Sequence, residues 1–381
     1  MGTQDYDVIV VGLGAMGSAT AYHLTRRGYR VLGLDANARQ HKNGSSHGSS
    51  RIIREAYMEG PDYVPIVQRA YELWRELEAE TGQKLLNITG CLTIGAPDSA
   101  FVKGALASCQ RFNLPHEYLS GPEINRRFPG YTLPEDLHAV LEPNGGFLFP
   151  EECVMAHLDL AARHGAEIRH EEAVLSYSAP GENEVIVETA QGRYQAERLV
   201  ITTGPWAAEL LAELGIPLEV WRIVNAHFEP EDPARFQPAN FPVWLLEAPE
   251  GDFYGFPALP GQGIKLGRHD LGEITTPQTI NRNVDPAEIK LLKDLVDKYM
   301  AGGAATFSKS LTCMYTMTPD HNFVLDRHPA HPNVVYGCGF SGHGFKFAAA
   351  IGEILAQMAV DGQTTQSIGF LSAARFRQPV R

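Results

Sequence analysis

The stretch Asp7-Val-Ile-Val-Val-Gly12-Leu-Gly-Ala-Met-Gly17 decides the fold of this chain. It opens with a continuous apolar run, which is typical of a strand buried on both faces of a parallel sheet. The glycines that follow have the GxGxxG spacing. Gly12 makes a tight turn, Gly14 lets the backbone approach a pyrophosphate, and Gly17 lets the next helix pack closely on the strand.

The residues after this stretch complete a strand–helix–strand unit. Ser18–Arg27 has the pattern of a helix that Gly28 ends, and Tyr29–Leu34 is a second apolar strand closed by Asp35. In such units the helix N-terminus stabilises phosphate, and an acid at the end of the second strand accepts a hydrogen bond from a ribose hydroxyl. The sequence therefore predicts a dinucleotide-binding domain at the start of the chain.

The composition of the 381-residue chain is that of a globular protein, with 44% hydrophobic and 20% charged residues. At roughly 150 residues per domain, this length allows two or three domains. The net charge of −13 opposes binding to nucleic acid or anionic lipid, and no apolar run approaches the ~18 residues of a membrane span. Five widely spaced cysteines and an N-terminus without a signal-peptide pattern favour a cytoplasmic protein with reduced thiols.

Hydrophobic periodicity predicts further elements along the chain. Short alternating strands between residues 217 and 317 indicate an antiparallel sheet, whereas residues 88–150 are mixed and rich in glycine and proline. The other expected elements are helices over Tyr63–Thr81, Cys153–His164, Asp285–Met300 and Phe345–Val360, and strands within Glu167–Glu188, Arg193–Thr202 and Val334–Tyr336.

Two later segments favour FAD over NAD as the dinucleotide. Gly337–Lys346 is a second glycine-rich strand–turn–helix segment, and a buried strand ends near Gly204. An NAD-dependent dehydrogenase usually keeps its nucleotide domain continuous at one end of the chain. Three separated segments that converge on one extended ligand suit FAD better. The alternative function from another enzyme class is an NAD-dependent dehydrogenase.

Four motifs make the chain resemble the FAD-dependent N-methyl amino acid oxidases, the family of the monomeric sarcosine oxidases. The motifs are Val8–Ala19, Gly44–Arg54, Thr312–Asp320 and Gly339–Lys346. The resemblance runs from Asp7 to about Gly352, and the last two motifs are specific to this family. It departs at Ser49-Ser50, where the family often has Asp-Thr, so that the acid at position 49 is missing.

The resemblance implies the fold class and the division into domains. It implies an α/β protein in which an FAD-binding, Rossmann-like βαβ domain of the glutathione-reductase type is interleaved with a substrate domain that contains an antiparallel sheet. We expect the FAD domain over residues 1–83, 148–216 and 318–381, and the substrate domain over residues 84–147 and 217–317. A monomer is also implied.

The resemblance further implies the residues that bind FAD. Cys313 matches the cysteine that carries the flavin as a thioether at its 8α-methyl carbon; taken alone, a single cysteine between Leu311 and Met314 is typically a core thiol. The full set implied to bind FAD is Gly12, Gly14, Ala15, Met16, Gly17, Asp35, Gly44, Ser45, Ser50, Arg51, Val174, Cys313, Gly342, Gly344, Phe345 and Lys346.

The catalytic residues that the resemblance implies include two cations that would bind the carboxylate of the substrate. Arg54 would bind the substrate carboxylate with a planar fork, and Lys346 would complete the anion site. From spacing alone, Arg51 and Arg54 are three apart and fit a common turn, although a pair of surface cations has the same spacing.

The resemblance implies that Lys265 activates oxygen and that His269 lies in the substrate cavity. Their spacing places both on one face of a strand, and a solvated strand face is the ordinary interpretation of that pattern. Tyr254 and Tyr315 match hydroxyls that line the substrate pocket, but either one also suits an ordinary core.

The implied reaction is oxidation of the N-methyl group of sarcosine by O2, giving glycine, formaldehyde and hydrogen peroxide. The implied partners are a small secondary amino acid and O2, without nucleic acid or membrane. The alternative substrates within the same fold are N-methyltryptophan, pipecolate and proline-like amino acids.

Overall fold

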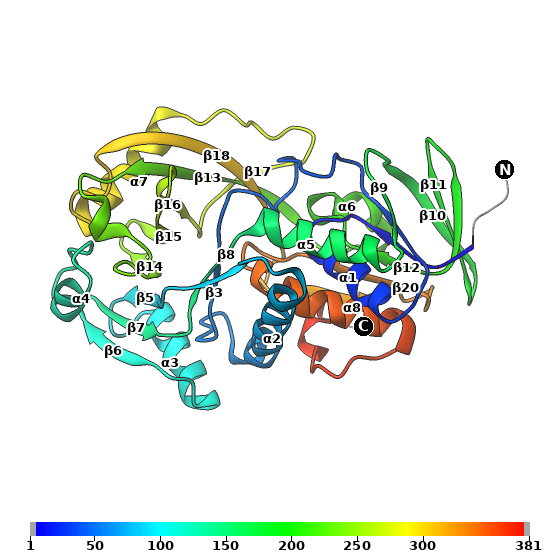
Figure 1. Cartoon of the computed structure of the whole chain (residues 1–381), viewed down its shortest axis with the longest axis horizontal. Coiled ribbons are helices and arrows are strands. Elements are labelled where there is room, and N and C mark those ends of the chain that lie inside the picture. Colours follow the sequence, from blue (N-terminus) through cyan, green and yellow to red (C-terminus); the bar gives the residue numbers. More distant parts are fainter. Residues whose placement is uncertain (1–4, 377–381) are drawn as a thin grey trace, which may run out of the picture.

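The computed structural model describes residues 5–376 and has two large sheets at opposite ends of an elongated molecule (Figure 1). The first sheet has the strand order β10-β11-β12-β1-β2-β9, with β20 pairing with β12 and β19 with β20. Its strands are β1 (Asp5–Val11), β2 (Val31–Leu34), β9 (Glu167–Arg169), β10 (Val174–Gly181), β11 (Glu184–Thr189), β12 (Arg193–Ile201), β19 (Val324–Arg327) and β20 (Val334–Cys338).

The strand predicted from the opening stretch lies in the middle of this sheet, where β1 pairs in parallel with both β2 and β12. Val8 and Val10 join one buried cluster, and Ile9 and Val11 join another. One face of the sheet is covered by helices α1 (Ala15–Arg26), α5 (Pro150–Arg163) and α8 (Ala348–Asp361), and α2 (Val64–Thr81) packs on α8 and α5. The uninterrupted apolar run therefore follows from burial on both faces.

The first helix begins at Ala15, three residues earlier than the predicted start at Ser18. The last part of the glycine motif thus forms the first turn of α1 rather than a loop before it. A Cβ on Gly17 would lie 1.7 Å from the carbonyl oxygen of Gly12. Gly17 is therefore required for helix–strand packing, the role that the motif assigns to it.

The second sheet has the order β17-β13-β16-β15-β14-β5-β7-β6, and β18 also pairs with β13. The pairs are antiparallel except for β14 with β5. Its strands are β5 (Cys91–Gly95), β6 (Glu117–Ser120), β7 (His138–Glu142), β13 (Glu219–Glu229), β14 (Val243–Ala248), β15 (Gly251–Leu259), β16 (Gly263–Arg268), β17 (Glu273–Thr275) and β18 (Thr306–Met317).

The predicted helix after Asp285 forms as α7 (Pro286–Tyr299), with Asp285 and Glu288 in a capping box. In contrast, residues 88–150 contain two helices for which we made no prediction, α3 (Ala100–Phe112) and α4 (Gly121–Arg127). The predicted helix at Phe345 begins as a 3-10 turn over Phe345–Phe347 before α8.

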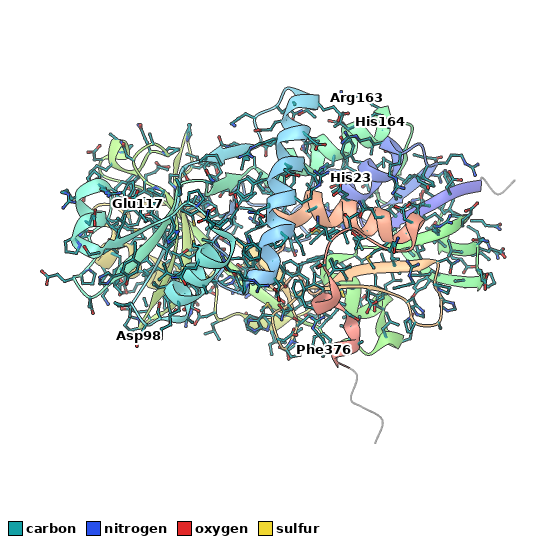
Figure 2. The ribbon with its side chains drawn as sticks, turned by 90° about the horizontal axis from the view of Figure 1, so that it is seen from below. His23, Asp98, Glu117, Arg163, His164 and Phe376 are labelled. Atoms are coloured by element: carbon teal, nitrogen blue, oxygen red, sulfur yellow. The ribbon has the colours of Figure 1, made fainter. Side chains whose placement is uncertain are left out.

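A small third sheet connects the two large ones. It has the order β3-β8-β4, from β3 (Arg51–Ile53), β8 (Gly146–Leu148) and β4 (Leu86–Ile88). Figure 2 shows α2 between the two halves, with Asp98 and Glu117 on the side of the second sheet and His23 and Phe376 on the side of the first.

We keep the division into two domains as a proposal. Residues 1–4 and 377–381 of the expected FAD domain lie outside the described residues. None of the helices in residues 5–376 combines the length and apolar character that a membrane span requires.

Candidate active site

One cavity of about 890 Å³ runs between the two large sheets. Ligand pockets usually have ~300–1,000 Å³, so this cavity lies near the upper end of that range. Most of the predicted residues line it: Gly12, Gly14, Ala15, Met16, Asp35, Gly44, Ser45, Arg51, Arg54, Val174, Tyr254, His269, Cys313, Tyr315, Gly342, Gly344, Phe345 and Lys346. Gly17, Ser50 and Lys265 are not among the lining residues.

The end of the cavity beside β1 suits a nucleotide. Asp35 is fixed there, because its carboxylate accepts hydrogen bonds from the backbone N–H groups of Leu13 and Asn37, each at 2.8 Å. The backbone N–H of Ala15 donates to Ser46 Oγ over 3.1 Å at the start of α1. A helix N-terminus and a fixed carboxylate are the groups that bind pyrophosphate and ribose. The residues present therefore fit FAD.

Cys313 and Arg51 meet in the middle of the cavity. The guanidinium of Arg51 donates to Cys313 Sγ over 3.6 Å and to the carbonyl oxygen of Ser45 over 2.9 Å. Arg51 belongs to β3, so the prediction that Arg51 and Arg54 project from one turn is wrong. The extended backbone sends Arg51 towards Cys313 and Arg54 towards the far end of the cavity.

Lys265 lies behind the cavity wall and is only 3% exposed. His269 directly follows β16 and lines the cavity, whereas Lys265, within β16, is not among the lining residues. Lys265 Nζ donates to the carbonyl oxygens of Gly48 and Ser50, at 2.7 and 3.0 Å. Burial lowers the pKa of Lys265, whereas these acceptors stabilise its ammonium form.

Arg54 has a partner that the sequence analysis missed. Its guanidinium binds both carboxylate oxygens of Glu59, at 2.7 and 2.6 Å, and the Arg54 side chain is 1% exposed. The guanidinium lowers the pKa of Glu59 against the opposing effect of burial. No pattern pointed to Glu59, because the pair depends on the path of the loop between them.

Lys346 lies near this ion pair. Arg54 and Lys346 both face the ring of Tyr57, at 4.5 and 5.1 Å from its centroid. Lys346 Nζ donates to the carbonyl oxygen of His343 over 2.8 Å. Burial, followed by the charge of Arg54, lowers the pKa of Lys346 to about 7. With Lys346 protonated, two cations and one carboxylate leave a single positive charge at this end.

Polar side chains from β13, β15 and β18, and that of His269 just after β16, line the cavity near these cations. The hydroxyl of Tyr254 donates to Asn225 Oδ1 over 2.7 Å, and the Tyr315 hydroxyl lies 3.4 Å from His269 Nδ1. Burial lowers the pKa of His269 to about 4 and raises the pKa of Tyr254 to about 12. These groups are therefore neutral near pH 7. Asn225 was not predicted; it lies in a continuous run of buried residues along β13.

Two further carboxylates, also missed, hold the loops that carry the cations. Glu151 accepts from the backbone N–H of Gly48 at 2.6 Å, close to Ser49, whose φ is 70°. Glu142 accepts from the backbone N–H groups of Glu55 and Ala56, at 2.8 and 2.7 Å. Position 49 thus lacks an acid of its own, and Glu151 supplies a carboxylate to the same loop.

The chain belongs to the FAD-dependent oxidoreductases: the model of the family described as FAD dependent oxidoreductase matches residues 7–358. The predicted fold class and cofactor FAD are thereby confirmed. A solved structure of NikD, described as an unusual amino acid oxidase essential for nikkomycin biosynthesis, has a TM-score of 0.85 and 27% identity. The match covers 97% of this chain and 98% of that chain.

Similar curated proteins confirm the predicted resemblance. The chain is 45% identical to a monomeric sarcosine oxidase of Streptomyces avermitilis, over 97% of each chain. It is 42% identical to a monomeric sarcosine oxidase of a Bacillus species, over 97% of this chain and 96% of that one. An N-methyl-L-tryptophan oxidase of Yersinia pestis is 35% identical, over 98% of this chain and all of that one.

Proposed function

We propose that this protein is a sarcosine oxidase, which converts sarcosine, O2 and water to glycine, formaldehyde and hydrogen peroxide. The observation that carries the proposal is the pair of cations, Arg54 and Lys346, on the ring of Tyr57 at one end of the FAD cavity. With Lys346 protonated, these two cations and the carboxylate of Glu59 leave one positive charge, which suits a single substrate carboxylate. The identity of 41–45% to monomeric sarcosine oxidases supports the same substrate class.

The chain's own residues would bind and orient the substrate. Arg54 and Lys346 hold the carboxylate, and Tyr254, Tyr315 and His269 surround the amine with neutral polar groups. A neutral surrounding favours the amine over its ammonium form, because burial penalises charge. FAD, once bound, accepts the hydrogen and electrons that leave the N-methyl group.

We propose that Cys313 holds FAD covalently and that Lys265 assists the reaction with O2. Cys313 Sγ faces the cavity beside a guanidinium, and the thiolate is the nucleophilic form of cysteine. Lys265 is a buried cation placed just behind the wall, where it would stabilise negative charge as it develops on oxygen. The five buried free cysteines support a reducing cytoplasmic setting, and the names of the relatives support a monomer.

A panel of amines tests the substrate. The purified protein is incubated with sarcosine, N-methyltryptophan, pipecolate and proline, and peroxide is measured. We expect sarcosine to have the highest kcat/KM. A higher value for N-methyltryptophan or for a cyclic amino acid would contradict the proposal and leave the family assignment intact.

A further inference from the structure

His343 contacts the cation site in two ways. Its backbone carbonyl oxygen accepts from Lys346 Nζ over 2.8 Å, and its ring Nδ1 is hydrogen bonded to the hydroxyl of Tyr57. Arg54 and Lys346 both lie against the ring of Tyr57, at 4.5 and 5.1 Å from its centroid. His343 therefore binds one of the two cations directly, and its side chain binds the aromatic ring that both cations share.

A turn near the C-terminal end of the second motif pair holds the other side of the His343 ring. His343 Nε2 lies 3.0 Å from the carbonyl oxygen of His321, whose φ is 59°. Arg375 donates to the carboxylate of Asp320 over 2.7 Å and to the carbonyl oxygen of Asn322 over 2.9 Å. These bonds fix the turn on both sides of His321, so the imidazole ring has a fixed anchor.

The hydrogens of these two ring contacts can be assigned. A carbonyl oxygen only accepts, so Nε2 carries the hydrogen that is donated to His321. Burial lowers the pKa of His343 to about 3, so the ring is neutral near pH 7 and Nδ1 has a lone pair. Burial also raises the pKa of Tyr57, and its hydroxyl therefore donates to Nδ1. Both ring nitrogens are then occupied, and neither is left to bind a ligand in the cavity.

We propose that His343 is a positioning residue, which acts through the hydroxyl of Tyr57 on the site of the substrate carboxylate. It fixes the ring against which Arg54 and Lys346 converge. Cation–π attraction depends on where the cation lies over the ring, so a fixed ring also fixes the places of the two cations. The proposal deepens the proposed function and rests on it for the carboxylate.

Two substitutions of His343 separate the roles of its ring nitrogens. The short amide of His343→Asn reaches about the place of Nδ1 and keeps an acceptor for the hydroxyl of Tyr57. The longer amide of His343→Gln reaches about the place of Nε2 and lacks that acceptor. We would titrate the intact FAD-loaded protein with acetate by calorimetry. His343→Gln should weaken acetate binding by about 3- to 10-fold, the usual effect of one hydrogen bond, and His343→Asn should keep most of the affinity. An equal loss in both variants would overturn the proposal.

Tyr57→Phe removes the same hydrogen bond from the other partner and keeps the aromatic ring, so it also decides the test if His343→Gln does not fold. It should weaken acetate binding by a similar factor, and the double variant should be no weaker than either single variant. Multiplied losses in the double variant would overturn the proposal.

Tyr63→Phe is the matched control. Tyr63 is also buried and packs on His343, with 5.8 Å between the ring centroids, but its hydroxyl donates to Asn322 Oδ1. This variant should leave acetate binding unchanged, and a loss as large as that in Tyr57→Phe would overturn the proposal.

Sarcosine kinetics provide a second measurement. His343→Gln should raise KM by a similar factor and change kcat far less, because the carboxylate is bound equally in the ground state and the transition state. A lower kcat with an unchanged KM would overturn the positioning role. If the amine panel rejects sarcosine, the proposed function fails, whereas the acetate titration still decides on the role of His343.

Discussion

At the scale of single residues, Cys313 is the side chain whose chemistry is easiest to isolate. We expect acid-precipitated protein to remain yellow and Cys313→Ser to release its FAD into the supernatant, because only a covalent bond survives unfolding. Absorbance of the supernatant measures the release. Cys338→Ser is the matched control, since Cys338 is also buried and lies in the other glycine-rich segment but is not a cavity-lining residue. Release from the unmodified protein would refute the covalent link.

Lys265 should affect the rate of flavin reoxidation by O2 and hardly affect the rate of flavin reduction by the amine. Lys265→Met should slow reoxidation of the flavin by O2 by about 10²- to 10³-fold, the usual cost of removing one preorganised electrostatic contact. Reduction by sarcosine should change far less, because the cation is needed only when negative charge develops on oxygen. Stopped-flow traces of the two half-reactions measure both rates. Lys309→Met, an exposed lysine of β18, is the control, and equal losses in both halves would instead indicate a packing role.

Arg54 should carry much of the affinity for small substrates. Arg54→Met combined with Glu59→Gln removes the cation without leaving a buried carboxylate unpaired. We expect kcat/KM for sarcosine to fall by about 30- to several-thousand-fold, corresponding to roughly 2–5 kcal/mol for a desolvated charge pair. Acetate should stop competing with sarcosine. Dimethylamine, which has no carboxylate, should react poorly with both proteins and to a similar extent. Normal sarcosine kinetics in the variant would exclude this site for the carboxylate.

The residues that the sequence missed share a physical reason. Arg54 and Lys346 lie in motifs that carry the resemblance, so they were predicted. Glu59, Glu142 and Asn225 act through partners that are set by the path of a loop or by the register of a sheet. The pairing and register of the strands cannot be read from a single sequence. Lys265 was predicted by the resemblance, but its hydrogen bonds to the carbonyl oxygens of Gly48 and Ser50 depend on the path of the loop before β3.

At the scale of elements, the loop from Arg54 to Glu59 is held by the buried carboxylate at the end of β7. Burial raises the pKa of Glu142 to about 7, although the backbone N–H groups of Glu55 and Ala56 lower it. Its pKa in the unfolded chain is lower, near 4.5. Between these values the folded protein binds one more proton, so the contribution of Glu142 to the free energy of unfolding falls as pH rises.

Glu142→Gln should remove this contribution. Between about pH 5 and 7 the unmodified protein should lose up to ~1.4 kcal/mol of stability per pH unit relative to the variant. Urea unfolding at a series of pH values measures the difference. Glu135→Gln, an exposed carboxylate before the same strand, should keep the pH dependence of the unmodified protein. Parallel curves for the unmodified protein and Glu142→Gln would contradict the prediction.

The elements themselves were predicted where local patterns are strong. The strand, glycine turn and helix at Asp7–Arg27 combine period, turn chemistry and length, and the structure differs by one to three residues at the element ends. Residues 88–150 form two helices and several short strands. No element was predicted there, because the segment is rich in glycine and proline and has no dominant hydrophobic period. Their order comes from packing on the second sheet, as in the pairing of β5 with both β7 and β14.

At the scale of the whole molecule, the candidate site depends on bringing the two ends of the chain together. The turn that carries Lys346 leads directly into α8, and α8 packs on α1 and α2. The indole Nε1 of Trp74 on α2 donates to the carbonyl oxygen of Lys346 over 2.9 Å. The position of Lys346 beside Arg54 therefore depends on the packing of α8 against α1 and α2.

Gly352 of α8 packs against Ala19 of α1, and this contact gives a test of that dependence. A Cβ on Gly352 would lie 2.4 Å from Ala19 Cβ and 2.6 Å from the backbone carbon of Ala19. Alanine ordinarily stabilises a helix interior by about 1 kcal/mol relative to glycine. Here the backbone of α1 cannot yield as a flexible side chain would, so the overpacking cost of roughly 1–3 kcal/mol should prevail. We expect Gly352→Ala to lower both the melting temperature and the affinity for acetate.

Gly369→Ala is the control, because no atom lies within 4 Å of the added Cβ, and it should change neither quantity. A higher melting temperature in Gly352→Ala would contradict the argument.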